Sequence, residues 1–188
     1  MCVSPEVRNV IEATRRKLRE ARFFHQHLMN LRHGRSATYE PEAFGFYFSA
    51  FISAARSVFW VLHHEEETRW EAWKPGWEAT LNDEEQKFLR FTNQLRIAEV
   101  HLSGAETIVE WEEVDELLGR NLDLERQHPA YGIHRSSQPG FSVTAKVMRR
   151  AYYLEQENIK EEVTVVGERY LNFLEKVIQE FEQAHKSQ

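Results

Sequence analysis

The sequence predicts one all-α domain over residues 1–188, an antiparallel, up-and-down bundle of four to five helices. Three observations predict this fold. Long segments carry apolar residues at spacings of three or four. The chain has only 8 Gly and 5 Pro, which leaves room for long helices. Apolar residues make up 41% and charged residues 29%, the balance of a folded domain with a core rather than of a disordered chain.

The first helix is expected between Ser4-Pro5 and Gly34, because serine caps a helix well, proline suits its first position and glycine favours its end. Residues 1–36 hold eight basic and three acidic groups, a charge of +5 that leaves −11 for the rest of a chain of net charge −6. Such a basic helix could face an anionic ligand. More often it is solvated or pairs with the acidic part of its own domain.

The second helix is expected over residues 41–66. Residues 43–62 have roughly the length of a membrane span, but three serines and the central Arg56 favour a buried core helix, with no membrane contact. With a single cysteine no disulfide framework is possible, so we expect a cytoplasmic protein. Arg56 needs acceptors if buried. It shares a face with small residues that would let another helix approach closely: Gly45, Ser49, Ser53 and Ser57.

Three tryptophans, Trp70, Trp73 and Trp77, follow within eight residues, around a Pro75-Gly76 pair that indicates a turn. They could form a stacking platform for bases. A loop packed against the core is the commoner use of such residues, and we expect that arrangement here.

Two more helices are expected, over residues 82–103 and from about residue 158 to about 185, the last with a clear apolar stripe. Residues 107–112 and 143–154 show partial alternation and β-branched or aromatic content. They are expected to pair as a short two-stranded β excursion before the last helix. Residues 113–119 are expected as a helical turn.

Two segments together suggest a chemistry. The helix sequence YFSAFISAARSVFWVL, residues 47–62, is followed by RIAEVH, residues 96–101, near the end of another helix. This pair resembles the HEPN-like helical domains, whose signature is arginine followed after four to six residues by histidine. The resemblance covers roughly residues 5–105 and loosely the last helix. One position departs from the family pattern, since Ile97 stands where a polar residue often follows the arginine.

The resemblance implies an all-α, usually dimeric protein that binds RNA or nucleotides, and in some members a metal-independent ribonuclease. Arg96 would hold the phosphate through its forked guanidinium, and His101 would act as acid or base. Five helical positions separate them by about 140°, so a symmetric dimer would help them converge. Asn93 and Glu99 could orient Arg96, and Arg56 could support the site. Alternatively, Arg96 pairs with an acid and His101 is a hydrogen-bonded histidine at a helix end.

Histidines and glutamates at three places have the spacing of possible metal ligands. His63 and Glu67 share a helix face, but a solvated helix end is the commoner use of such a cluster. Two Glu-x-x-His pairs have the spacing of a di-iron bundle, yet one runs into a proline and the other lies at the chain end. They are Glu125/His128 and Glu182/His185. No metal or cofactor is therefore expected.

The sequence thus predicts a HEPN-like, RNA-directed homodimer, with Arg96 and His101 as the catalytic pair of a toxin or defence endoribonuclease. An antitoxin or a nucleotidyltransferase would be its partner protein. The alternative is a non-catalytic helical binding module, or a partner subunit, that recognises a protein or a nucleotide.

Overall fold

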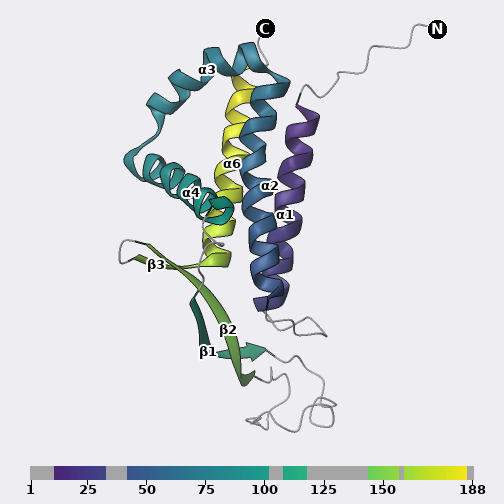
Figure 1. Cartoon of the computed structure of the whole chain (residues 1–188), viewed down its shortest axis with the longest axis vertical. Coiled ribbons are helices and arrows are strands. Elements are labelled where there is room, and N and C mark those ends of the chain that lie inside the picture. Colours follow the sequence, from purple (N-terminus) through teal and green to yellow (C-terminus); the bar gives the residue numbers. More distant parts are fainter. Residues whose placement is uncertain (1–10, 33–41, 102–107, 118–143, 157–158, 186–188) are drawn as a thin grey trace, which may run out of the picture.

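The computed structural model describes residues 11–32, 42–101, 108–117, 144–156 and 159–185. The described residues form five helices, with a small antiparallel sheet before the last one (Figure 1). This confirms the predicted all-α bundle with a β excursion. The elements are α1 (Glu12–Arg32), α2 (Ala43–Glu65), α3 (Glu67–Thr80), α4 (Asp83–His101), β1 (Ile108–Leu117), β2 (Thr144–Gln156), β3 (Ile159–Glu162) and α6 (Val163–His185).

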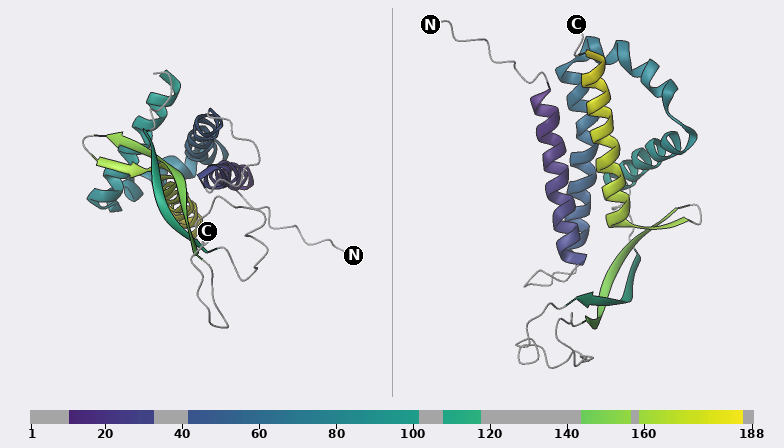
Figure 2. Two further views of the ribbon diagram at one scale, coloured as in Figure 1. Left: turned by 90° about the horizontal axis from the view of Figure 1, so that it is seen from below. Right: turned by 180° about the vertical axis from the view of Figure 1, so that it is seen from behind.

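Helices α1, α2 and α6 lie side by side and make the body of the bundle (Figures 1 and 2). Helix α1 is antiparallel to α2, and α6 runs in the direction of α2. Between α2 and α6 the chain runs back along the bundle, and this stretch consists of two helices, α3 and α4. Helix α3 leaves the bundle at one end, and α4 comes back across α2 and α6 at an angle. The up-and-down path is therefore kept, but its third leg is bent outward.

Helix α2 is central, as its apolar composition predicts, and nine of its side chains are buried. It is also the one described helix that is long and apolar enough to cross a membrane, by length and composition only. Its core face packs against α1 and against the buried stripe of α6. The largest fully buried side chains of the core include Phe44, Phe48, Phe51, Ile52, Leu62, Tyr170, Leu174 and Ile178.

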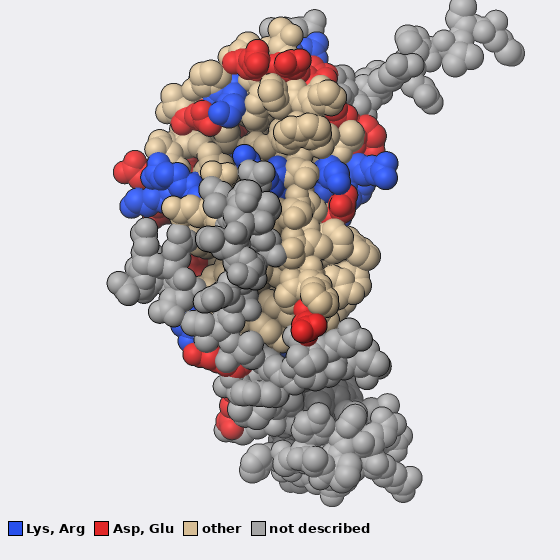
Figure 3. Space-filling model, viewed as in Figure 1, with Lys and Arg blue, Asp and Glu red and all other residues tan. Residues whose placement is uncertain are grey.

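Most basic side chains of α1 pair with glutamates, two of them with α6, so little of the helix is left as a free anion-binding surface. Arg15 Nη2 lies 2.6 Å from Glu182 Oε2, and Arg22 Nη2 lies 2.6 Å from Glu175 Oε2. The hydrogen bond to Glu182 raises the pKa of Arg15. On the face shown in Figure 3, basic and acidic groups of the described residues lie next to one another rather than in patches of one sign.

The start of α1 is held by a carboxylate from the far end of α2. Glu65 accepts hydrogen bonds from the backbone N–H groups of Ala13 and Thr14, both at 2.8 Å, and from the Thr14 hydroxyl at 2.6 Å. This satisfies N–H groups that have no partner within the helix. The predicted ends of this helix, Ser4-Pro5 and Gly34, lie outside the described residues.

The tryptophan segment is helix α3, so the predicted loop is wrong. Pro75 lies inside the helix and removes one backbone hydrogen bond. The helix persists because Trp70 and Trp77 are buried. Their rings pack against Phe173 and Phe181 of α6, and Trp77 Nε1 donates to Glu180 Oε2 at 2.8 Å. Packing of these two rings in the core, which we preferred to a stacking platform, is confirmed.

The sheet has the strand order β1-β2-β3 with antiparallel neighbours. Its first two strands are the predicted ones, with β1 longer than expected. The expected helical turn over residues 113–119 is wrong as far as Leu117, because β1 continues to that residue. The short strand β3 was not predicted, and α6 begins only at Val163. Tyr152 of β2 stacks on Phe44 of α2, with ring centroids 3.4 Å apart, and so attaches the sheet to the bundle.

Two helical glycines are expected to respond in opposite directions to replacement by alanine. A Cβ at Gly167 of α6 would lie 2.6 Å from Cδ2 of His25, whose Nε2 donates to the Thr164 carbonyl oxygen at 2.9 Å. Gly167→Ala should therefore lower the free energy of unfolding by about 1–3 kcal/mol. Nothing lies within 4 Å of a Cβ at Gly45, so Gly45→Ala should raise it by up to about 1 kcal/mol. Urea unfolding followed by circular dichroism measures both; equal stability of the two variants would contradict the close α1–α6 contact.

Candidate functional site

A pocket of about 740 Å³ lies where α2, α3 and α4 meet. It opens on the outer face of α2, beside the stretch of α3 and α4 that bends away from the bundle. Its volume falls in the range of sites for small molecules. The pocket is lined by polar, cationic and aromatic side chains: Ser53, Arg56, Ser57, Phe59, Trp60, His63, Trp70, Lys74, Trp77, Glu78, Leu89, Arg90 and Asn93.

Two arginines face this pocket from different helices. Arg56 is half-buried in the middle of α2, and Arg90 is exposed on α4. Among the described residues neither forms an ion pair or a hydrogen bond, whereas the third cation, Lys74, lies 2.8 Å from Glu78. Two guanidinium groups without a carboxylate leave the pocket with unneutralised positive charge. An anionic ligand would supply the missing acceptors.

The inner side of Arg56 lies toward the core. Its charge acts on Tyr170 of α6, which is only 2% exposed. Burial raises the pKa of Tyr170 to about 12, while a hydrogen bond with Thr92 and the charge of Arg56 act in the opposite direction. Arg56 thus lines the pocket and its charge also acts on a buried phenol, while no acid of the described residues pairs with it.

Aromatic rings form part of the wall. Trp60 is 68% exposed, and its ring stacks on His64 with centroids 5.5 Å apart and an angle of 10°. Trp70 and Trp77 are buried behind it and hold α3 against α6. Trp60 is thus the one tryptophan of this wall with a face open to a ligand, and an exposed indole beside cations suits a flat aromatic group.

The residues at the start of α4 determine how this helix is positioned beside the pocket. Asn82 Oδ1 accepts from the N–H of Glu85 at 2.9 Å, and Glu85 Oε2 accepts from the N–H of Asn82 at 3.1 Å. This reciprocal cap fixes where α4 begins. Phe88 then packs edge-on against Tyr170 and Phe173 of α6, with centroids 6.0 Å from each. With that face inward, Arg90 and Asn93 line the pocket.

The structure brings together two of the five residues predicted for the site. Arg56 and Asn93 come from different helices and line the same pocket. Helix α4 also carries Arg96, Glu99 and His101, but these side chains lie outside the described residues. Asn93 precedes Arg96 by three positions, about 4.5 Å along the helix axis. The backbone of Arg96 therefore continues α4 directly beyond the pocket wall.

Other expectations about these residues change. The small-residue face of α2 is not covered by another helix: Ser53 and Ser57 line the pocket, and Gly45 is exposed. Arg90 and Trp60 were not predicted as site residues. The sequence spacing could have indicated both residues. Arg90 precedes Asn93 by three positions and Trp60 follows Arg56 by four, and residues at these spacings are neighbours on one face of a helix.

The two Glu-x-x-His pairs do not offer a di-metal site among the described residues. Glu182 binds Arg15 through both carboxylate oxygens, at 2.6 and 2.7 Å. His185 Nδ1 lies 2.7 Å from the carbonyl oxygen of Phe181. Glu125 and His128 lie outside the described residues.

No protein-family model, no curated protein and no solved structure matches the chain.

Proposed function

We propose that this chain is an RNA-directed helical protein that binds single-stranded RNA in the α2–α3–α4 pocket. The observation that carries the proposal is the pair Arg56 and Arg90, two cations without an anionic partner among the described residues. A phosphate between them would accept charge-assisted hydrogen bonds. A base would stack on Trp60, as bases do on exposed aromatic rings in proteins that bind single strands.

The chain is acidic overall, with a net charge of −6, so this pocket would attract RNA by local rather than global charge. The basic helix α1 adds little to that attraction, because four of its arginines pair with glutamates: Arg15 and Arg22 with α6, Arg19 with Glu12 and Arg32 with Glu162. The proposal therefore predicts that RNA affinity depends weakly on the basic side chains of α1 and strongly on the side chains that line the pocket.

The proposal extends to cleavage through the resemblance to HEPN-like domains. Arg96 would hold the scissile phosphate, with Asn93 and Glu99 orienting it, and His101 would transfer the proton. Strand scission by an arginine and a histidine needs no metal. We further propose that the protein works in the cytoplasm as a homodimer, since a two-fold axis beside α4 would bring Arg96 and His101 of two subunits into one groove.

The second candidate is a non-catalytic module that binds a nucleotide. The size of the pocket favours it, because about 740 Å³ accommodates one nucleotide rather than a long strand. The same arginines and Trp60 would then hold the phosphate and the base. Titration with a mononucleotide beside an oligonucleotide separates the two candidates, since only RNA binding gains affinity with strand length.

The first test is fluorescence anisotropy of a labelled ten-nucleotide RNA with Arg56→Gln, Arg90→Gln and the double variant, in EDTA. Each loss of a charge-assisted contact should weaken binding about tenfold or more. The double variant should also flatten the plot of log affinity against log salt by about 1.4, or 0.7 for each phosphate contact.

The control is Arg16→Gln/Arg19→Gln, which removes the same charge from exposed positions of α1. It should bind RNA as the wild type does. A matched aromatic pair extends the test: Trp60→Ala should lose roughly fivefold or more through stacking, and Phe46→Ala, exposed on the same helix but outside the pocket, should not. If the arginine control weakens binding as much as the pocket variant, the pocket is not the RNA site.

A further inference from the structure

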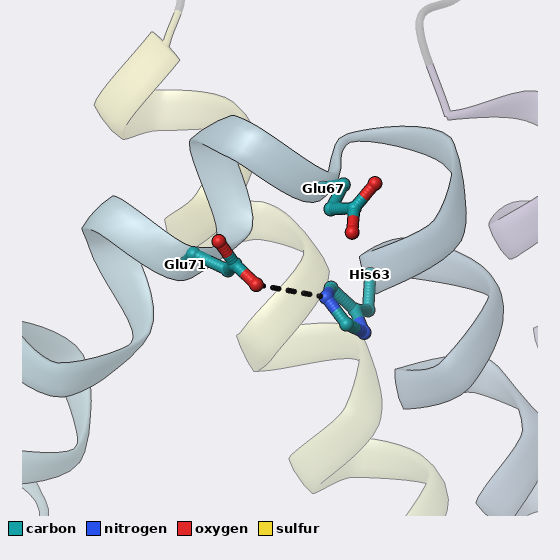
Figure 4. Close-up of side chains that lie close together, drawn as sticks. All are labelled: His63, Glu67 and Glu71. Atoms are coloured by element: carbon teal, nitrogen blue, oxygen red, sulfur yellow. Dashed lines mark ion pairs between the residues drawn. The ribbon is translucent and has the colours of Figure 1, made fainter.

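A second cluster of chemically active side chains lies at the junction of α2 and α3. His63 comes from the last turn of α2, and Glu67 and Glu71 come from the first two turns of α3 (Figure 4). One ligand atom of each residue lies within 4.8 Å of those of the other two. The two glutamates are four apart and share a helix face, and the figure shows both carboxylates on the side of the imidazole.

The imidazole of His63 has an unsatisfied nitrogen. Its side chain is 41% exposed, yet its Nε2 atom is inaccessible to solvent and forms no hydrogen bond. The nearest acceptor is Glu71 Oε1 at 3.7 Å, which is too far for a hydrogen bond. A buried polar atom without a partner is uncommon in folded proteins and calls for an explanation.

Among the described residues the two carboxylates have no lysine or arginine partner, and the one ion pair they form is the long one between Glu71 and His63 (Figure 4). The basic groups nearby are engaged elsewhere: Arg69 lies 3.1 Å from Glu66, and Lys74 lies 2.8 Å from Glu78. Neither Glu67 nor Glu71 pairs with lysine or arginine within the described chain. Two carboxylates and an imidazole nitrogen without a hydrogen bond thus converge, and no lysine or arginine of the described residues neutralises the carboxylates.

We propose that His63, Glu67 and Glu71 bind a divalent transition-metal ion, with Zn²⁺ the best fit. One imidazole and two carboxylates are ligands that zinc accepts at about 2.0–2.2 Å. Two such ligands of a tetrahedral ion are about 3.4 Å apart. The observed 3.7 Å between Nε2 and Oε1 of Glu71 is close to that separation, and the carboxylate of Glu67, which is exposed and within 4.8 Å of both, would have to move closer to complete the set. An ion of this kind would give Nε2 a bonding partner and would neutralise the negative charge of both carboxylates.

Three protein ligands leave a fourth position for water or a ligand oxygen. His63 also lines the α2–α3–α4 pocket, so the ion would lie at its rim. The ligands lie on both sides of Glu66, the one non-helical residue between α2 and α3. The metal would therefore fix the direction in which α3 leaves α2. This inference does not rest on RNA binding or on cleavage.

The test is a titration of the full-length, EDTA-treated and dialysed protein with Co²⁺ alone, followed by visible absorption, and then displacement by Zn²⁺. We expect one equivalent to bind. His63→Gln and Glu71→Gln should each weaken binding by at least about tenfold, because loss of a direct ligand exceeds the usual effect of losing a supporting group.

The control variants are His64→Gln and Glu84→Gln. His64 is the neighbouring exposed histidine, and Glu84 is an exposed acid on α4. Both should bind metal as the wild type does. Equal affinity of wild type and His63→Gln, or no saturable binding at millimolar metal, overturns the proposal. No RNA is present in this titration and the RNA assays contain EDTA, so each proposal can fail without the other.

Discussion

His101→Ala is expected to lower the rate of RNA cleavage by about 10²- to 10⁴-fold while leaving RNA affinity nearly unchanged. The reason is a proposed division of labour along α4. Arg90 and Asn93, in the middle of the helix, line the proposed binding pocket, and His101 is the last residue of the same helix. In-line attack by a 2′-hydroxyl needs a group that takes or gives a proton near neutral pH, and histidine is the side chain suited to it.

The measurement is single-turnover cleavage of an end-labelled RNA in EDTA, with anisotropy of the same RNA to confirm binding. His185→Ala is the matched control, because it also removes a histidine from the last turn of a helix, and it should cleave as the wild type does. Cleavage by His101→Ala at the wild-type rate would remove His101 from the mechanism. A wild type that binds RNA without cutting it would favour the non-catalytic module.

Stability above pH 10 should depend on one buried hydroxyl. Tyr170 is 2% exposed, and burial raises its pKa from the ordinary value of a tyrosine, about 10, to about 12. The fold thus favours the protonated phenol. The contribution of this hydroxyl to the free energy of unfolding is complete below pH 10. It is lost as the pH rises from 10 to 12, because Tyr170 then ionises in the unfolded chain but stays protonated in the folded one. That difference in pKa corresponds to roughly 3 kcal/mol.

Phenylalanine cannot ionise, so the order of stability of wild type and Tyr170→Phe should reverse as the pH rises. At pH 7 the variant should be less stable than the wild type by about 1 kcal/mol, because it loses the hydrogen bond with Thr92. Near pH 12 it should be the more stable of the two. Thr92→Val is the control, since it removes the hydrogen bond but keeps the phenol, and it should retain the alkaline loss. Urea unfolding at several pH values measures all three; parallel curves for wild type and Tyr170→Phe would contradict the prediction.

Apolar periodicity, together with capping residues and the apolar content of residues 43–62, was enough to predict four of the helices, because each of them buries part of its own surface in the core. Helix α3 escaped prediction for a physical reason. Pro75-Gly76 indicates a turn locally, and what outweighs it is the packing of Trp70 and Trp77 on α6, about a hundred residues further along the chain. Strand β3 escaped for a similar reason, since its four residues form a strand only by pairing with β2.

The candidate site was predictable as separate residues but not as a pocket. Arg56 draws attention as a charge within an apolar helix, and Asn93 as a polar neighbour of Arg96. Nothing local shows that α4 crosses α2 so that Asn93 and Arg90 meet Arg56 at one place. The same holds for Glu71. The sequence places His63 and Glu67 on one face, but the contact with Glu71 depends on the break at Glu66.

That break has a thermodynamic consequence. Glu66, with φ −135° and ψ 44°, is the single residue at which the chain turns from α2 into α3, so its backbone angles set the angle between the two helices. A ligand in the pocket would contact both helices, and so would an ion held by His63, Glu67 and Glu71. Two ligands that favour the same angle between α2 and α3 would have linked affinities. Whatever factor the ion adds to the affinity for RNA, RNA must add to the affinity for the ion.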